Sequence, residues 1–313
     1  MRIVFFGTSY FAAEILAFLK ALPYQVVGVV TRTDKPQGRD LKLGMSPVKK
    51  LLTSESSQIP PFQPEKASTE EFCDQIRLLK PDLFLVVAYG EILKSNILSL
   101  PIKACVNIHT SLLPKYRGAA PIQRALMNGD SVSGVTFMEM ALKMDAGDIL
   151  LQETVPVSRE MNTSDLEQAL LESAKKRLPE FLSHFDSYYS QKKFQDESLV
   201  TFAAKIIAED SLIDWTQSAE SVHNRIRALS PAPGAYVNIQ FGPQVKRLKI
   251  LKSREGLAVK NQRPGDLQIT RNSLQVAAGD AFLELLEVQL EGKKIMQIEE
   301  FLRGVPKHLS LVP

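Results

Sequence analysis

Three polar residues in this sequence have the types and spacing that acid–base chemistry at a carbonyl group would need. Asn107 and His109 lie two positions apart at the end of an apolar run, and Asp145 lies in an acid-rich turn further along the chain. In a β-strand, residues two apart point to the same side. An asparagine amide can donate to a developing oxyanion, and a histidine can carry a proton. A nearby carboxylate would orient the imidazole and favour its charged form.

Other interpretations of these residues stay open. His109 could be a buried structural histidine, and the turn at 145–148 could hold only solvated carboxylates. Ser111 with His109 and Asp145 would suit a serine hydrolase, but the chain has no G-x-S-x-G elbow and Ser111 is only two residues from His109. The loop at 111–114 leaves the strand in the kind of position where binding groups concentrate.

The net charge of +3 hides an uneven distribution of charged residues. Residues 1–205 carry 24 basic and 23 acidic side chains, whereas residues 225–271 carry 10 basic and 2 acidic ones. The segment 31–50, read as a long loop, carries 6 basic and 2 acidic side chains. These basic stretches predict surfaces for a polyanion or a phosphate-bearing substrate. The alternative is a solvated face whose lysines protect a sheet edge.

Composition and motifs argue against several other classes of protein. Hydrophobic residues make up 44% and charged residues 23%, an ordinary globular balance, and no apolar run approaches the ~20 residues of a membrane span. Cys73 and Cys105 are too few for a disulfide scaffold or a zinc site, so a reducing cytoplasm is expected. After Gly7, Ser9 and Ala12 stand where a dinucleotide fingerprint has glycines, so a tight turn is favoured over nucleotide binding.

The elements that would position the candidate residues alternate between strands and helices in the first half of the chain. Apolar runs predict strands at 2–6, 25–30, 82–88, 104–109, 134–140 and 149–157. Helical spacing follows Ser9, recurs at 70–79 and 121–127, and continues from 163 to about 188 with Pro179 inside. Apolar strands separated by helices indicate a doubly wound, mainly parallel sheet, whose functional crevice lies beyond the carboxyl ends of the strands.

The second half of the chain changes character after a polar segment. A helix is expected at 219–228, and strands at 235–241, 245–251, 265–269, 273–277 and 281–289. Several short strands with Gly and Pro between them predict a small β-barrel. The sequence therefore predicts a domain at 1–189, a linker at 190–205 and a second domain at 206–313.

The motifs together resemble the formyltransferases that use 10-formyltetrahydrofolate, and among them the methionyl-tRNA formyltransferase family. The broader resemblance rests on N-x-H-x-S-L-L-P at 107–114 and D-A-G-D at 145–148. The narrower one rests on FGT at 6–8, DKPQGR at 34–39, SPVK at 46–49, GVTFM at 134–138, IDW at 213–215, IRA at 226–228 and PGA at 233–235. It extends over nearly the whole chain.

The resemblance implies a fold, a reaction and two substrates. The fold would be α/β: a Rossmann-like, doubly wound, mainly parallel sheet, followed by a small C-terminal OB-like β-barrel domain that helps to hold tRNA. The enzyme would transfer the formyl group of 10-formyltetrahydrofolate to the free α-amino group of methionine on initiator methionyl-tRNA. The products, N-formylmethionyl-tRNA and tetrahydrofolate, would place it in translation initiation. No metal is implied.

The resemblance also assigns roles to individual positions. Asn107, His109 and Asp145 match the catalytic residues. The folate-binding loop is matched by Ser111, Leu112, Leu113 and Pro114. The tRNA-binding residues would be Arg39, which matches the loop arginine at the acceptor end, with Lys42, Lys246, Arg247 and Lys249. Three positions depart from the family's usual residues but lie outside the catalytic set: Asp40, Thr110 and Ala232.

Two rival functions stay open: one is a related enzyme with another acceptor, and the other is a binding protein without activity. A formyltransferase acting on a sugar nucleotide or a purine precursor would share the catalytic residues but would need neither basic stretch. A tRNA-binding module without activity would not need intact Asn107, His109 and Asp145. We expect a cytoplasmic monomer without a membrane partner.

Overall fold

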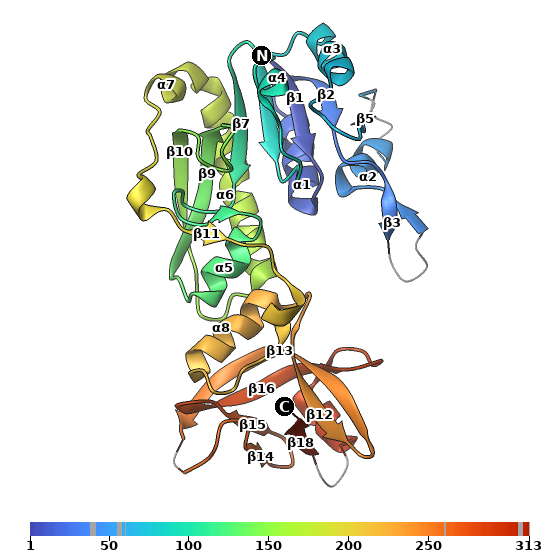
Figure 1. Ribbon diagram of the computed structural model, residues 1–313, viewed down its shortest axis with the longest axis vertical. Coiled ribbons are helices and arrows are strands. Elements are labelled where there is room, and N and C mark those ends of the chain that lie inside the picture. Colours follow the sequence, from blue (N-terminus) through green and yellow to red (C-terminus); the bar gives the residue numbers. More distant parts are fainter. Residues whose placement is uncertain (38–41, 55–57, 60, 260, 306–308, 313) are drawn as a thin grey trace. The chain divides into compact units, whose positions relative to one another are not determined.

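The computed structural model describes residues 1–37, 42–54, 58–59, 61–259, 261–305 and 309–312 (Figure 1). The chain forms two compact units that interleave along the sequence. Unit 1 comprises Met1–Gly118, Ser133–Val155 and Glu167–Phe202, and unit 2 comprises Ala119–Val132, Pro156–Leu166 and Ala203–Pro313. These units follow packing rather than chain order, so the division at 190–205 stays a prediction.

Unit 1 is built on a seven-stranded sheet in the order β10-β9-β7-β6-β1-β2-β5. Its strands are β1 (Arg2–Gly7), β2 (Gln25–Val30), β5 (Pro61–Phe62), β6 (Leu83–Val87), β7 (Ala104–His109), β9 (Val132–Glu139) and β10 (Ile149–Pro156). Strands β7, β6, β1, β2 and β5 run parallel, and β9 pairs antiparallel with β7. The doubly wound, mainly parallel sheet expected from the sequence is confirmed.

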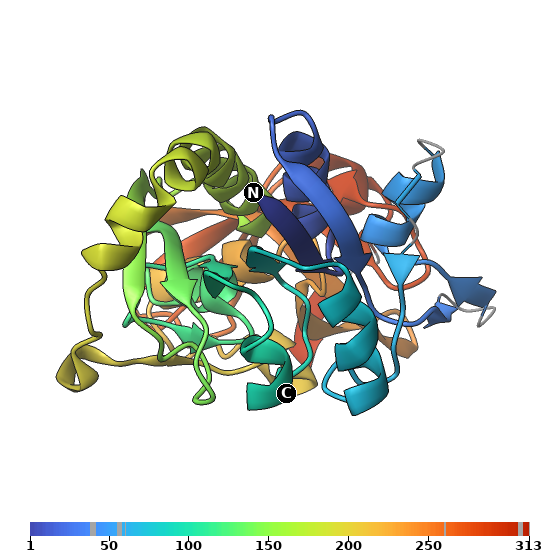
Figure 2. The ribbon, with the colours of Figure 1, turned by 90° about the horizontal axis from the view of Figure 1, so that it is seen from above.

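Helices cover both faces of this sheet (Figure 2). They are α1 (Tyr10–Lys20), α2 (Pro47–Ser54), α3 (Glu70–Leu78), α4 (Ser95–Leu98), α6 (Thr163–Ser183) and α7 (Phe185–Ser190). Helices α1 and α6 lie on one face, where Lys175 Nζ is 3.0 Å from Glu14 Oε2, and α3 and α4 lie on the other. Phe5 and Phe6 point to opposite faces, and both are fully buried. This double burial explains why the strand shows no polar alternation.

The turn from β1 into α1 shows why a glycine is needed there. A Cβ on Gly7 would lie 2.6 Å from the Phe5 ring and 2.7 Å from Ala12 Cβ, so the glycine allows strand and helix to pack closely. The Ser9 hydroxyl accepts a hydrogen bond from the Ala12 amide at 3.2 Å and caps the helix. The interpretation of this segment as a tight turn therefore has a steric basis.

The long helix expected from residue 163 is divided near its end. α6 runs through Pro179 and ends at Ser183, and α7 begins at Phe185 after the non-helical His184. Proline removes one backbone donor, but buried neighbours hold the turn: Leu178 and Phe181 are fully buried, and Phe181 lies 4.7 Å from Phe137 of β9, ring centre to ring centre. Tertiary packing therefore overrides the local cost of the proline.

Unit 2 is dominated by an antiparallel sheet in the order β14-β15-β16-β13-β12-β18, with β17 paired to β16. The strands are β12 (Ala235–Phe241), β13 (Gln244–Ala258), β14 (Leu267–Ile269), β15 (Leu274–Ala277), β16 (Ala281–Leu290), β17 (Met296–Gln297) and β18 (Leu309–Val312). The helices α5 (Pro121–Met127), α8 (Ala219–Leu229) and α9 (Ile298–Arg303) complete the unit. This sheet is consistent with the expected OB-like domain.

Strand β13 extends well beyond the expected 245–251. Its register against β16 shifts at three places, between Ile250 and Lys252, between Lys252 and Ser253, and between Glu255 and Ala258. Such bulges bend a strand and increase its twist, which lets one long strand curve around a core. They also break the alternation of side chains, so the sequence pattern loses the strand after Leu251.

The remaining elements are short. They are the strands β3 (Lys35–Gln37), β4 (Lys42–Gly44), β8 (Arg117–Gly118) and β11 (Phe202–Ala203) and the 3₁₀ turns η1 (Glu197–Leu199) and η2 (Ala208–Ser211). Among the described helices, none has both the length and the apolar character of a membrane span.

Candidate functional site

Asn107 and His109 lie toward the carboxyl end of β7, an interior strand of the unit 1 sheet. Asn107 pairs in register with Val86 of β6 and Met138 of β9, and His109 pairs with Thr136. A strand hydrogen-bonded on both sides gives the two side chains a rigid base. The Asn107 side chain is partly exposed, and among the described residues it has no hydrogen-bond partner. Its amide is therefore available to a ligand.

His109 is held between two acceptors. Its Nε2 lies 2.9 Å from the Tyr116 carbonyl oxygen, and its Nδ1 lies 3.8 Å from Asp145 Oδ2. The imidazole is almost fully buried, at 6% exposure. Both ring nitrogens therefore face oxygen atoms that can accept hydrogen bonds. The 3.8 Å separation exceeds a normal hydrogen bond, and such contacts often tighten only when substrate is present.

Asp145 lies in a turn whose backbone is tightly constrained. Its φ is +50°, in the left-handed region that L-residues other than Asn and Asp rarely adopt. Its Oδ2 accepts a hydrogen bond from the Gly118 amide at 2.8 Å. A Cβ on Gly147 would overlap the carbonyl oxygen of Glu139, so only glycine fits there. The sequence offers two interpretations of 145–148, a tight turn and a carboxylate partner for His109. Both features are present in this turn.

Asp148, the second acid of this turn, belongs to a separate ion cluster. Its Oδ2 lies 3.3 Å from Lys192 Nζ, which also contacts Glu139 Oε2 at 2.6 Å. The hydrogen bond to Glu139 is the main cause of a raised pKa for the Lys192 ammonium. Asp148 therefore shares its lysine partner with Glu139.

The loop at 111–114 is pinned by polar side chains from neighbouring strands. The Thr136 hydroxyl donates to the Ser111 carbonyl at 2.7 Å and lies 3.2 Å from the Leu113 amide, which donates to it. Gln152 Nε2 donates to the Leu113 carbonyl at 2.8 Å. Thr136 falls within the GVTFM motif at 134–138, whereas no sequence motif points to Gln152.

The four residues of this loop differ in their exposure to solvent. Ser111 and Leu113 are buried, and the Ser111 hydroxyl donates to the Lys115 carbonyl at 2.7 Å. Leu112 and Pro114 are partly exposed, so these two carry the apolar surface that a flat ring could contact. Close packing of Leu112 also requires Gly134, because a Cβ there would lie 2.5 Å from Leu112 Cδ2.

These contacts weigh against the alternative chemistries. The Ser111 hydroxyl is committed to a carbonyl rather than to His109, so the residues do not form a hydrolase triad. Cys105 is buried within β7, and burial raises the pKa of its thiol well above the usual range. In the part of the chain that the structure describes, no group of three or more His, Cys, Asp or Glu side chains could hold a metal ion.

In its described residues, 31–37 and 42–50, the basic segment forms regular elements where the sequence predicts a loop, which corrects that expectation. Strands β3 and β4 pair as a hairpin, with Gln37 opposite Lys42, and α2 begins at Pro47. Figure 1 shows the hairpin projecting beyond α2. Proline favours the first position of a helix, a signal that the loop interpretation overlooked. Arg39 lies outside the described residues.

Side-chain contacts fix the base of this hairpin. Thr31 Oγ1 and Ser46 Oγ are 2.7 Å apart and buried, and Lys49 Nζ lies 2.7 Å from Asp34 Oδ2. The hydrogen bond from Lys49 is the main cause of a lowered pKa for the Asp34 carboxyl. Lys49, one of the basic residues of the segment, is thus already paired.

In unit 2, the predicted basic residues of β13 lie on different faces of the strand. Arg247 and Lys249 share one face by their spacing, with Arg247 stacked over the Tyr236 ring at 4.1 Å and Lys249 Nζ bonded to the Pro233 carbonyl at 2.6 Å. Lys246 lies on the other face, 5.3 Å from the Phe241 ring. The structure therefore brings two of the three together.

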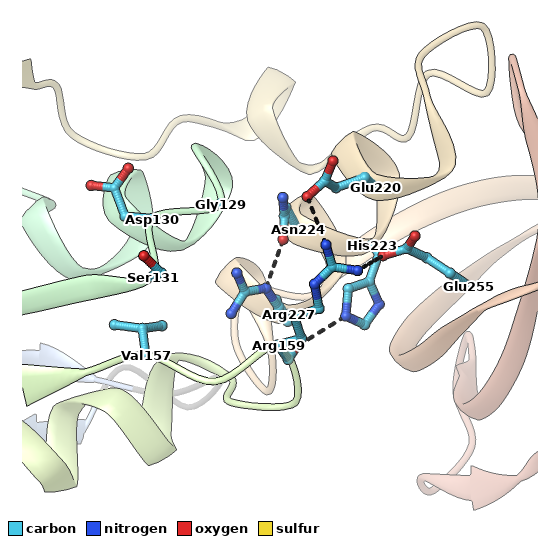
Figure 3. A pocket seen from close by; sticks show the side chains of 10 residues that line it. All are labelled: Gly129, Asp130, Ser131, Val157, Arg159, Glu220, His223, Asn224, Arg227 and Glu255. Atoms are coloured by element: carbon cyan, nitrogen blue, oxygen red, sulfur yellow. Dashed lines mark hydrogen bonds and ion pairs between the residues drawn. The ribbon is translucent and has the colours of Figure 1, made fainter.

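A cavity of about 160 Å³ in unit 2 contains none of the predicted site residues (Figure 3). Its charges are satisfied internally: Arg159 forms 3.7 Å ion pairs with both Glu220 and Glu255. His223 bonds to Ser253 Oγ at 3.0 Å and to the Arg159 carbonyl at 3.1 Å. These contacts are those of a structural network.

Comparisons with known proteins agree with the motifs and the fold. The sequence profile of the formyl transferase family matches residues 1–182, and that of the formyl transferase C-terminal domain matches residues 205–306. A methionyl-tRNA formyltransferase from Protochlamydia amoebophila (strain UWE25) is 43% identical over 309 residues, covering 98% of this chain and 96% of the relative.

Two solved structures share the fold at low identity. WlaRD, a sugar 3N-formyl transferase solved in the presence of dTDP and 5-N-formyl-THF, has a TM-score of 0.64 at 19% identity, covering 94% of this chain and 99% of its own. HypX from Aquifex aeolicus in complex with tetrahydrofolic acid has a TM-score of 0.62 at 17% identity. That match covers 97% of this chain but only 48% of HypX. The family profiles and the close relative are decisive: this chain belongs to the formyl transferase family and groups with its methionyl-tRNA formyltransferases.

Proposed function

We propose that this protein transfers the formyl group of 10-formyltetrahydrofolate to the α-amino group of methionine on initiator methionyl-tRNA. The observation that carries the proposal is that Asn107 and His109 lie two apart near the carboxyl end of β7, with Asp145 Oδ2 3.8 Å from His109 Nδ1. The 43% identity to a methionyl-tRNA formyltransferase over nearly the full length supports the choice of acceptor. The products are N-formylmethionyl-tRNA and tetrahydrofolate, which suit a role in translation initiation.

In the proposed reaction, the unprotonated amine attacks the formyl carbon and negative charge grows on the formyl oxygen. The free amide of Asn107 donates to that oxygen, and protonated His109 adds positive charge beside it. The carboxylate of Asp145 stabilises the imidazolium. The bond from the formyl carbon to N10 then breaks, N10 gains a proton, and the amine loses one, by way of Asp145, His109 or water.

The substrates would be held by different parts of the chain. We assign the folate co-substrate to the loop of Ser111, Leu112, Leu113 and Pro114, where Leu112 and Pro114 offer partly exposed apolar surface. The tRNA surface would include the hairpin segment with Arg39 and Lys42, and the face of β13 that carries Arg247 and Lys249; the predicted Lys246 lies on the other face of that strand. We also predict a cytoplasmic monomer.

The decisive experiment compares acceptors with purified protein and 10-formyltetrahydrofolate. We expect formylation of methionyl initiator tRNA, little formylation of methionyl elongator tRNA, and none of uncharged tRNA. An amino-sugar nucleotide serves as the rival acceptor. Preferential formylation of the amino sugar would replace the proposed substrate, and tRNA binding without formyl transfer to any acceptor would overturn the enzymatic proposal.

A further inference from the structure

The side-chain amide of Gln195 connects two parts of the candidate site that lie far apart in the sequence. Gln195 lies in the extended segment after α7, in the region that the sequence predicts as a linker. Backbone hydrogen bonds in both directions between Lys193 and Ile149, at 2.8 and 2.9 Å, fix this segment beside the start of β10. All of these residues belong to unit 1.

On one side, the Gln195 amide holds the turn that carries Asp145. Its Nε2 donates to the Asp145 carbonyl at 2.8 Å and to the Gly147 carbonyl at 2.7 Å. One NH₂ group thereby satisfies two backbone acceptors of the same turn. Asp145 has a φ of +50°, in the left-handed region that aspartate can adopt, and the two bonds from Gln195 help to hold the turn in that conformation. The Asp145 carboxylate extends from this backbone, so a shift of the turn would move its Oδ2 relative to His109 Nδ1, which lies 3.8 Å away.

On the other side, the Gln195 amide accepts from a buried arginine. Its Oε1 accepts from Arg117 Nε at 3.0 Å and from Nη2 at 2.8 Å. Arg117 is 1% exposed, and its Nη2 also bonds to Glu197 Oε1 at 2.8 Å. Its Nη1 is buried without a partner among the described residues, so the guanidinium cannot easily lose the contacts it has.

The two sides meet at the Asp145 carboxylate. Arg117 is followed by Gly118, whose amide donates to Asp145 Oδ2 at 2.8 Å. The same carboxylate oxygen lies 3.8 Å from His109 Nδ1. Gln195 therefore bonds to the backbone of Asp145 itself. It also bonds to Arg117, the neighbour of the glycine whose amide donates to the Asp145 carboxylate.

We propose that Gln195 is a positioning residue for formyl transfer: its amide sets the carboxylate of Asp145 relative to His109. This inference rests on the proposed function, because it assumes that Asp145 and His109 take part in the reaction. The segment after α7, which the sequence predicts as a linker, thereby supports the site by holding the turn of Asp145.

The substitution Gln195→Glu separates the two halves of the contact. An ionised glutamate still accepts from Arg117, but it has no hydrogen to donate to the carbonyls of Asp145 and Gly147. Gln195→Met, of similar length but with no donor and only a weakly accepting sulfur, removes both halves. The matched control is Gln191→Ala, an exposed glutamine of the same segment whose Nε2 only reaches Ser187 Oγ at 3.4 Å.

The test measures single-turnover formyl transfer to methionyl initiator tRNA, the KM of each substrate, and the thermal unfolding midpoint. For Gln195→Glu we expect the transfer rate to fall about 10- to 100-fold, the loss that an ångström-scale misplacement can cause, while both KM values stay within about twofold. Gln191→Ala should match the wild type. Circular dichroism would establish that each variant is folded.

The possible outcomes distinguish this inference from the proposed function. A wild-type protein that formylates no acceptor overturns the proposed function itself. An active wild type with equally active, folded Gln195→Glu and Gln195→Met variants overturns only the positioning role. Loss of rate together with raised KM and a lowered unfolding midpoint, or failure of both variants to fold, would assign Gln195 to fold stability instead.

Discussion

Replacing Asn107 with alanine tests the central chemical step of the proposed reaction. Asn107 lies on β7 between β6 and β9, and its side-chain amide has no partner among the described residues. Alanine therefore removes a donor without leaving a protein group unsatisfied, and we expect the free energy of unfolding to change by less than about 1 kcal/mol. The folate loop, held by Thr136 and Gln152, should keep its structure.

The expected kinetic effect follows from the loss of one preorganised donor. Removing such a donor from an oxyanion typically costs about 2.7–4 kcal/mol, or 10²- to 10³-fold in turnover. His109 remains, so some catalysis should survive. Because the amide is proposed to act on charge that develops only in the transition state, folate affinity should be nearly unchanged.

The assay is rapid-quench formyl transfer with enzyme in excess over methionyl initiator tRNA and saturating 10-formyltetrahydrofolate. Asn107→Asp keeps the shape but replaces the donor with acceptor oxygens, so it should be at least as slow as Asn107→Ala. Asn272→Ala, in an exposed turn, is the matched control. Single-turnover transfer by Asn107→Ala within about threefold of the wild type would refute the oxyanion role.

Three further predictions follow from the geometry. Gly147→Ala should lower the free energy of urea unfolding by about 1–3 kcal/mol, because its Cβ would overlap the Glu139 carbonyl oxygen; an unchanged midpoint would contradict that packing. Arg247→Ala should weaken tRNA binding and reduce the slope of log affinity against log salt by about 0.7–0.9, whereas an unchanged slope would remove Arg247 from the tRNA surface. Bonds from Arg117 and Lys143 lower the pKa of Glu197 from 4.5 to about 2, so its charge stabilises the fold above about pH 4.5 and this contribution is lost as the pH falls toward 2. Glu197→Gln should therefore be less stable than the wild type at pH 7, and the difference should shrink below about pH 4.5; a pH-independent difference in urea unfolding would count against this assignment.

Much of unit 1 could be predicted from the sequence because its elements are defined by local patterns. Strands β2 and β7 were expected at their observed bounds, since short apolar runs buried on both faces leave a clear signal. Helix α5 was expected at its observed bounds, and Pro121 at its start is a local signal of the same kind. The elements that the sequence missed, such as β3 and β4, span only three residues each.

The candidate site was predictable in part for a related reason. Asn107 and His109 share one strand, so period-two spacing alone places their side chains together. Asp145 lies 36 positions beyond His109, and its 3.8 Å approach depends on a turn in the left-handed region. Nothing in the local pattern around Gln195 indicates that its amide reaches that turn.

The sequence by itself determined the strand and helix periods, the sharp turn at Gly7, the placement of Asn107 and His109 at a strand end, and the uneven charge. These properties depend on neighbours within a few residues. The tertiary structure decided which distant groups meet: that Arg247 stacks over the Tyr236 ring, that Ser111 bonds to a carbonyl rather than to His109, and that a segment read as a linker contacts the turn of Asp145. Such contacts arise from packing and register across the whole unit, which side-chain spacing along one segment does not encode.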